Sequence, residues 1–187
     1  MDLAVVRPEP SPARLPDPPS RVIPVVAATG TGPTTLAAFD AALRAGGVAN
    51  YNLIRLSSVI PPGWTPVPAG TRPVHPGGQW GDRLYVVMAD QRARRPGQEA
   101  WAGIGWVRDR RSGRGLFVEH EGEDEGQVRA DIAASLAALC AGRRESFGPA
   151  RSVVKGTVCE GQPVCALVVA VYAVSPWTAP EPVLHLP

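Results

Sequence analysis

Apolar and β-branched residues occur along the chain in short runs that are bounded by Gly, Pro and polar residues. Runs of this length and composition are typical of β-strands that are buried on at least one face. The pattern predicts strands over residues 21–28, 52–58, 84–89, 100–108, 115–121, 152–158 and 164–174. The second of these strands ends before Pro61-Pro62-Gly63, because proline cannot donate a hydrogen bond within a sheet.

Two longer segments carry apolar residues at the spacing of an amphipathic helix. The first covers residues 34–45 and stops at Gly46-Gly47, and its apolar positions are Leu36, Phe39 and Leu43. The second covers residues 126–141 and stops at Gly142, and its apolar stripe consists of Val128, Ile132, Leu136 and Leu139. Both segments are predicted to be helices that bury one face.

The predicted order is one strand, a helix, four strands, a helix and two strands. Strands that are joined by short turns tend to pair in antiparallel fashion, and each helix needs a sheet on which to bury its stripe. We therefore expect an α+β fold, a layered sandwich of mainly antiparallel β-sheets with helices packed on the outer faces. This single domain covers residues 21–174, between a Pro-rich flexible arm over residues 1–20 and a Pro-rich tail over residues 175–187.

The composition excludes several classes of protein. A formal net charge of +2 gives no electrostatic reason to expect a nucleic-acid or anionic-membrane partner. No stretch approaches the roughly 20 apolar residues that cross a membrane, and the proline-interrupted N-terminus has no signal-peptide core. Cys140, Cys159 and Cys165 match no zinc-binding spacing. We expect a cytoplasmic protein with reduced thiols, no metal site, and no nucleic-acid or membrane partner.

Two adjacent serines, Ser57 and Ser58, lie where a predicted strand gives way to the Pro-Pro turn. A turn of this kind can hold a peptide bond in a strained conformation. The Ser58 hydroxyl could then attack the Ser57 carbonyl carbon, and β-elimination from the resulting ester would lead to a pyruvoyl group at residue 58. On spacing alone the alternative is favoured, in which both serines only satisfy backbone groups at the end of a strand.

Two blocks of sequence change this balance. LAAFDAALRAGGVANYNLIRLSSVIPPG, over residues 36–63, resembles the corresponding block of the pyruvoyl-dependent arginine decarboxylases. GLFVEHEG, over residues 115–122, resembles the second signature block of that family. The resemblance covers about residues 21–174 and is loose over residues 77–114, which carry additional Arg and Trp.

The resemblance implies a role for five residues of this chain. Cleavage between Ser57 and Ser58 makes Ser57 the end of a β chain and turns Ser58 into the covalent pyruvoyl cofactor at the start of an α chain. Asn52 matches the residue that assists self-processing, Glu119 the proton donor, and Asp40 the acid that faces the substrate guanidinium. From the residues alone, a surface carboxylate on a strand is the favoured interpretation of Glu119, and a solvated acid on a helix is as well supported for Asp40 as a binding role.

The function that the resemblance implies is conversion of L-arginine, a small-molecule substrate, to agmatine and CO2 through a Schiff base on the pyruvoyl group. The family also implies a homotrimer of cleaved protomers, or a hexamer, with pockets between subunits. Two alternatives stay open. One is the same chemistry on a different amino acid, since residues 77–114 depart from the family pattern. The other is an uncleaved, non-catalytic structural or regulatory relative.

Overall fold

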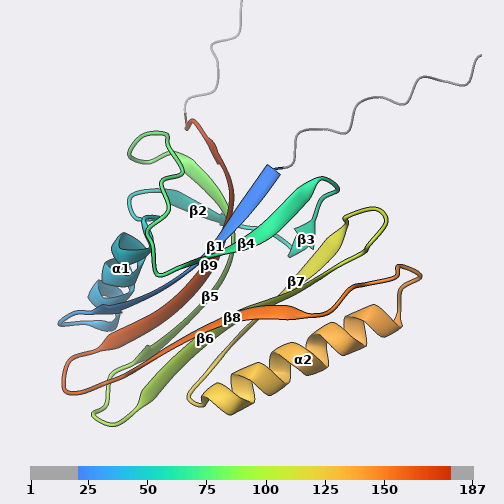
Figure 1. Cartoon of the computed structure of the whole chain (residues 1–187). Coiled ribbons are helices and arrows are strands. Elements are labelled where there is room, and N and C mark those ends of the chain that lie inside the picture. The colour runs from blue at the N-terminus through green and yellow to red at the C-terminus, as the bar shows by residue number, and fades with distance from the viewer. Residues whose placement is uncertain (1–20, 178–187) are drawn as a thin grey trace, which may run out of the picture.

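The computed structural model describes residues 21–177 and contains two β-sheets between two helices (Figure 1). In chain order the elements are β1 (Arg21–Thr31), α1 (Thr35–Gly46), β2 (Asn52–Arg55), β3 (Val59–Ile60), β4 (Trp64–Gly70), β5 (Arg83–Ala93), β6 (Glu99–Arg108), β7 (Gly115–Gly122), α2 (Glu125–Ala141), β8 (Arg151–Val158) and β9 (Val164–Ser175). The predicted arm and most of the predicted tail lie outside the described residues.

The strands form one five-stranded and one four-stranded sheet. The first sheet has the order β2-β5-β9-β1-β4 and the second the order β3-β7-β6-β8. Pairing is parallel between β1 and β4 and between β2 and β5, and antiparallel in the other pairs of strands. The predicted α+β sandwich of mainly antiparallel sheets is therefore confirmed.

The main core lies between the two sheets, and alternation along each strand supplies it. In β1, Val25 points into this core, whereas its neighbour Val26 packs on the side of α1. The second sheet contributes Ile104 and Phe117 to the same core. The two helices cover the outer faces of the sandwich, as predicted (Figure 1).

The buried side of α1 differs from the predicted one. Its buried residues are Ala38, Ala42 and Gly46, and Leu36 is exposed, so the predicted stripe is wrong at this position. The reason is the close approach of the helix to β1. A Cβ atom added at Gly30 would collide with the backbone nitrogen of Ala42, so only small residues fit at this contact.

Helix α2 agrees with its predicted stripe except at one end. Val128, Ile132 and Leu136 are buried against the second sheet. Leu139 is 36% exposed and does not continue the stripe. The N-terminus is capped by Asp124, whose carboxylate accepts a hydrogen bond of 2.7 Å from the backbone N–H of Gln127. A carboxylate in this position also interacts favourably with the helix dipole.

The predicted strand over residues 52–58 is wrong in its second half, and the pattern misses two strands, the short β3 and β4. Only Asn52–Arg55 form β2, and the chain then enters β3 at Val59. The longer of the two is β4, which contains Pro66 and Pro68 and pairs in parallel with β1. These prolines are tolerated because β4 lies at the edge of its sheet, where one side of the strand needs no donors.

Candidate active site

The Ser57–Ser58 bond lies where the chain crosses from one sheet to the other. The backbone N–H of Leu56 still donates to the Val86 carbonyl, at 2.9 Å, in the first sheet. Val59 already pairs with Leu116 of β7 in the second sheet. Both ends of this short connection are therefore held by sheets, and the bond between the two serines lies in the segment that joins the first sheet to the second.

Ser58 adopts a backbone conformation that is unfavourable for a residue with a side chain. Its φ angle is 65°, in the left-handed region. For a residue other than glycine this costs about 1–2 kcal/mol. The conformation is held by a hydrogen bond of 2.8 Å from the Phe117 N–H to the Ser58 carbonyl. The strained geometry predicted for this turn is therefore present at Ser58 itself.

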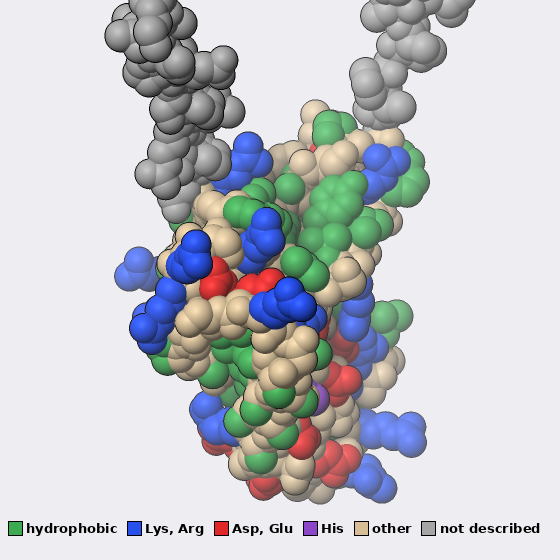
Figure 2. Space-filling view, turned by 90° about the vertical axis from the view of Figure 1, so that its right-hand side faces the viewer, with side chains coloured by type: hydrophobic (Ala, Val, Ile, Leu, Met, Phe, Trp, Pro, Cys, Tyr) green, Lys and Arg blue, Asp and Glu red, His purple; other side chains and the backbone are tan. Residues whose placement is uncertain are grey.

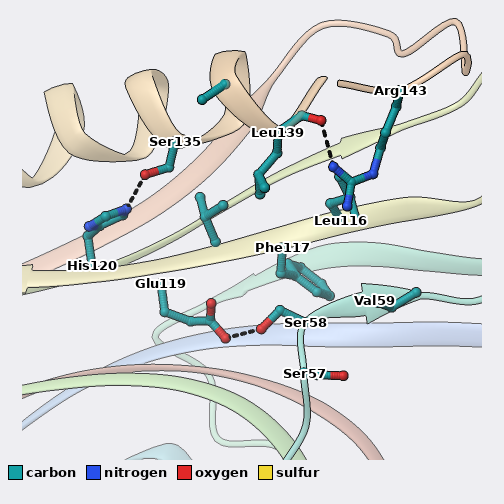
Figure 3. Close-up of a pocket in the computed structure, with 12 residues that line it drawn as sticks. Ser57, Ser58, Val59, Leu116, Phe117, Glu119, His120, Ser135, Leu139 and Arg143 are labelled. Atoms are coloured by element: carbon teal, nitrogen blue, oxygen red, sulfur yellow. Dashed lines mark hydrogen bonds between the residues drawn. The ribbon is translucent and has the colours of Figure 1, made fainter. Parts of the chain in front are cut away.

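The Ser58 hydroxyl donates a hydrogen bond to the Glu119 carboxylate (Figure 3). Glu119 lies on β7, two residues beyond Phe117, so both side chains point to the same side of the strand. Both Ser58 and Glu119 are partly buried, whereas Ser57 is exposed. The structure thus brings together two residues that lie far apart in the sequence, with a proton acceptor in direct contact with a hydroxyl nucleophile.

A hollow of about 510 Å³ opens beside this pair. Its lining residues are Ser57, Ser58, Val59, Leu116, Phe117, Val118, Glu119, His120, Ser135, Ala138, Leu139 and Arg143. Figure 3 shows that β7 divides these side chains, with Ser58 and Glu119 on one side and those of α2 on the other. Space of this size accommodates an amino acid, and the exposed Leu139 forms part of its wall.

His120 points away from Glu119, as alternation along a strand predicts. Its ring Nε2 lies 2.8 Å from the Ser135 hydroxyl oxygen, on the side of α2. The described residues contain no group of three or more His, Cys, Asp and Glu side chains placed to hold a metal ion. Within residues 21–177, moreover, neither helix is both long and apolar enough to span a membrane.

Asn52 and Asp40 do not contact Ser58 within the chain. The Asn52 side chain donates a hydrogen bond of 2.5 Å to the Gly81 carbonyl, at the start of β2. Asp40 lies on α1, where its carboxylate is 52% exposed and forms an ion pair of 3.2 Å with Arg44. Neither residue lines the hollow beside Ser58. The structure of one chain therefore does not bring these two residues to Ser58.

Tyr172 belongs to the site, although no pattern in the sequence singles it out. Its hydroxyl donates a hydrogen bond of 2.9 Å to the Val59 carbonyl, next to Ser58. Burial and, to a smaller extent, the nearby Glu119 carboxylate raise the pKa of this hydroxyl well above its usual range. In the sequence Tyr172 ends a run of small apolar residues in β9, where an aromatic side chain normally serves packing.

A second hollow carries many charges, at the end of the molecule that faces the viewer in Figure 2. Its lining residues are Asp109, Arg111, Ser112, Arg114, Arg144, Glu145 and Ser146. Asp109 organises it, because the carboxylate accepts hydrogen bonds from Ser112 and from the Ser146 N–H. These bonds, led by the one from the Ser112 N–H, lower the pKa of Asp109. This hollow therefore has a structural explanation and is separate from Ser58.

Comparison with known proteins identifies the family. The model of the family described as pyruvoyl-dependent arginine decarboxylase matches residues 22–176. A pyruvoyl-dependent arginine decarboxylase of Halobacterium salinarum is 39% identical over 146 residues, covering 77% of this chain and 89% of the relative. One of Methanococcoides burtonii is 34% identical over 126 residues, covering 63% and 68%. The chain belongs to the pyruvoyl-dependent arginine decarboxylase family.

Among solved structures, a pyruvoyl-dependent histidine decarboxylase is similar over 56% of each chain, with 19% sequence identity and a TM-score of 0.41. The family match confirms the resemblance seen in the two sequence blocks and includes the loosely similar residues 77–114. The cofactor of this family is a pyruvoyl group that is covalently part of the protein.

Proposed function

We propose that this protein cleaves itself between Ser57 and Ser58 and then decarboxylates L-arginine to agmatine and CO2. The observation that carries the proposal is the hydrogen bond from the Ser58 hydroxyl to Glu119, at a strained residue beside a hollow of substrate size. The alternative of two serines that only satisfy backbone groups is less favourable, since the Ser58 hydroxyl is bound to a carboxylate instead.

The first step of cleavage is an N-to-O acyl shift. Glu119 accepts the hydroxyl proton of Ser58 as Oγ attacks the carbonyl carbon of Ser57. The bond between this carbon and the Ser58 nitrogen breaks, and the nitrogen takes up a proton. Release of the strained φ angle at Ser58 favours this step, because Ser57 is then joined to Ser58 through Oγ and no longer through the backbone nitrogen.

The second stage converts the ester into the cofactor. Loss of the Ser58 Cα proton expels Ser57 as a carboxylate and leaves a dehydroalanine at position 58. Tautomerisation to an imine and addition of water then release ammonia and leave a pyruvoyl group. The residues around Ser58 fit such a group, because Phe117 and Val59 lie on either side of a partly buried site that is open to the hollow.

In decarboxylation, the pyruvoyl ketone supplies an electron sink for the substrate carbon that loses CO2. Glu119 lies against the side chain of residue 58 and is placed to deliver a proton to that carbon. The buried Phe117 lies on the same side of β7 as Glu119 and limits the water that could compete for this proton.

Recognition of the substrate guanidinium requires an acid besides Glu119, and no other acidic side chain of the described residues lines the hollow. We infer that Asp40 supplies it across a subunit contact, in a homotrimer or hexamer of cleaved protomers. Its exposure on α1 supports this role, because the carboxylate is accessible to a second subunit. A carboxylate and a guanidinium form paired, charge-assisted hydrogen bonds, which makes Asp suited to an arginine substrate.

The test is a product assay on the purified protein with L-arginine, and in parallel with L-lysine, L-ornithine and L-histidine. Mass spectrometry of the amine fraction should find agmatine and no comparable amount of the other amines. A Ser58→Ala variant should form none of them. If the cleaved protein forms another amine and no agmatine, the proposed decarboxylation is supported but arginine is not the substrate.

A further inference from the structure

Tyr172 connects the two sheets at the cleavage site. It lies on β9 in the first sheet, and its hydroxyl donates to the Val59 carbonyl in the second sheet, at 2.9 Å. Its ring packs against Phe117, with ring centres 6.3 Å apart, and against Trp64, with ring centres 5.8 Å apart. The ring is therefore fixed by packing, and the hydroxyl is directed at one backbone carbonyl.

This contact holds a part of the chain that has few other attachments. Strand β3 has only two residues, and the Val59 side chain is 56% exposed. The backbone of Ser58 and Val59 is thus held by the edge of β7 from one side and by the Tyr172 hydroxyl from the other. A tyrosine hydroxyl is a donor at neutral pH, and burial raises the pKa of this one further.

Without the hydrogen bond from Tyr172, the backbone at Ser58 has a less strained conformation available. Beyond Phe117, the edge of β7 extends past the end of its pairing with β3, which covers only Leu116 and Gly115. An unpaired strand edge favours pairing with a neighbouring extended segment. Ser58 could relax to an extended conformation along this edge, and its hydroxyl would then lose its alignment with Glu119.

We propose that Tyr172 is a positioning residue for self-cleavage, which fixes the Val59 carbonyl so that the Ser58 hydroxyl stays directed at Glu119. This role rests on the proposed cleavage between Ser57 and Ser58. It assigns to Tyr172 no contact with the reacting atoms. Its effect is on how often Ser58 adopts the reactive conformation before cleavage.

The experiment measures cleavage of newly made full-length protein in a cell-free translation reaction, by denaturing electrophoresis of the soluble fraction. Tyr172→Phe retains the ring and removes only the hydroxyl. We expect it to cleave about tenfold more slowly than wild type, which corresponds to about 1.4 kcal/mol of barrier. The matched control is Tyr51→Phe, which removes a similar bond of 2.6 Å to the Gly77 carbonyl and should cleave at the wild-type rate.

A second measurement separates positioning from a general loss of stability. Hydroxylamine cuts the ester formed by the acyl shift, so the fragments that it produces report the first step alone. In Tyr172→Phe these fragments should fall by the same factor as spontaneous cleavage. Thermal unfolding of both tyrosine variants in the uncleavable Ser58→Ala background should give similar midpoints, since each loses one hydroxyl bond.

The results for wild type and for Tyr172→Phe distinguish the two proposals. If wild type cleaves and Tyr172→Phe cleaves equally fast per soluble molecule, the positioning role is wrong and the proposed function stands. A Tyr172→Phe variant that is slow only because it unfolds more readily than Tyr51→Phe also removes the positioning role. If wild type itself does not cleave, the proposed function fails, and the role of Tyr172 fails with it.

Discussion

The hydroxyl of Ser58 donates a hydrogen bond to the carboxylate of Glu119, which lies 61 residues further along the chain. The two residues meet because the chain crosses between the sheets at Ser58 and enters the second sheet as the edge neighbour of β7. A hydroxyl and a strained backbone thus coincide at Ser58, and a carboxylate that can accept the hydroxyl proton lies in contact with it. In the proposed function, the same carboxylate acts on the substrate after the cofactor has formed.

Ser58→Ala should abolish cleavage, because alanine has no hydroxyl to attack the Ser57 carbonyl. The control is Ser57→Ala, which keeps both the attacking hydroxyl and the carbonyl that is attacked. Ser57 is exposed, so its replacement should leave cleavage largely intact. Denaturing electrophoresis after long incubation distinguishes the two variants. Cleavage of Ser58→Ala at the same bond would exclude the acyl-shift mechanism.

Glu119→Gln should slow cleavage about a hundredfold, because removal of a general base commonly costs a factor of this order or more. Glutamine can still accept a hydrogen bond from Ser58 but cannot take its proton at neutral pH. Glu121→Gln is the control, since Glu121 lies on the same side of β7 and is exposed. Time courses of fragment formation give both rates. Equal rates in the two variants would show that Glu119 is not the base.

Asp40→Ala should weaken the turnover of arginine without affecting cleavage. Loss of a hydrogen-bonded charge to the guanidinium should raise KM by about tenfold or more. The control is Glu125→Ala, because Glu125 also forms an exposed ion pair four residues along its helix, with Arg129. Exposed pairs of this kind contribute about 0–1 kcal/mol to stability, so both variants should remain folded.

Steady-state kinetics on the cleaved proteins, with arginine as substrate, measure this effect. If Asp40→Ala reduces cleavage and turnover by the same factor, then Asp40 has a structural role. If its KM for arginine equals that of Glu125→Ala, the substrate side chain is recognised elsewhere.

Asp109 should make stability depend on pH. The hydrogen bonds from Ser112, Ser146 and Arg111 stabilise the carboxylate and lower its pKa below the ordinary value of 3.8. A lowered pKa means that this stabilisation is present above the ordinary value and is lost as the pH falls through the folded-state value. Asp109→Asn should therefore lower Tm at neutral pH, and the difference from wild type should shrink as the pH falls below 3.8 and through the lowered pKa of Asp109.

The control for Asp109 is Asp131→Asn on α2, whose carboxylate contacts only Gln127 among the described hydrogen bonds. Its Tm should stay close to that of wild type across the pH range. A difference between wild type and Asp109→Asn that is constant with pH would show that the asparagine is disruptive for reasons other than charge.

Much of the fold can be predicted because periodicity reports burial directly. The helix over residues 126–141 and the strand over residues 164–174 agree with α2 and β9 to within one residue at each end. The errors occur where a tertiary contact determines which residues are buried or which segment forms a strand. Gly30 brings α1 so close to β1 that alanines are buried in place of the larger Leu36. Pairing with β1 makes a strand of the proline-containing β4.

The candidate site is predictable only in part. Ser58 and Glu119 lie in blocks that the family resemblance identifies, and the structure brings them into contact. Tyr172 cannot be selected in this way, because its role depends on a bond between two sheets whose arrangement the sequence pattern does not specify. Asp40 is predicted from the resemblance. Within one chain it lies on α1, whereas the helix that lines the hollow is α2. Its role stays a prediction.

Intact-mass analysis of the purified wild-type protein under denaturing conditions decides whether the chain cleaves itself to form a pyruvoyl group. We expect two species, residues 1–57 ending at Ser57, and residues 58–187 lighter by one ammonia than simple hydrolysis would leave them. That difference in mass distinguishes a pyruvoyl group from an ordinary amino terminus at Ser58. A single chain of full mass that persists on long incubation, or a second fragment with a free serine at its start, would rule out this self-processing.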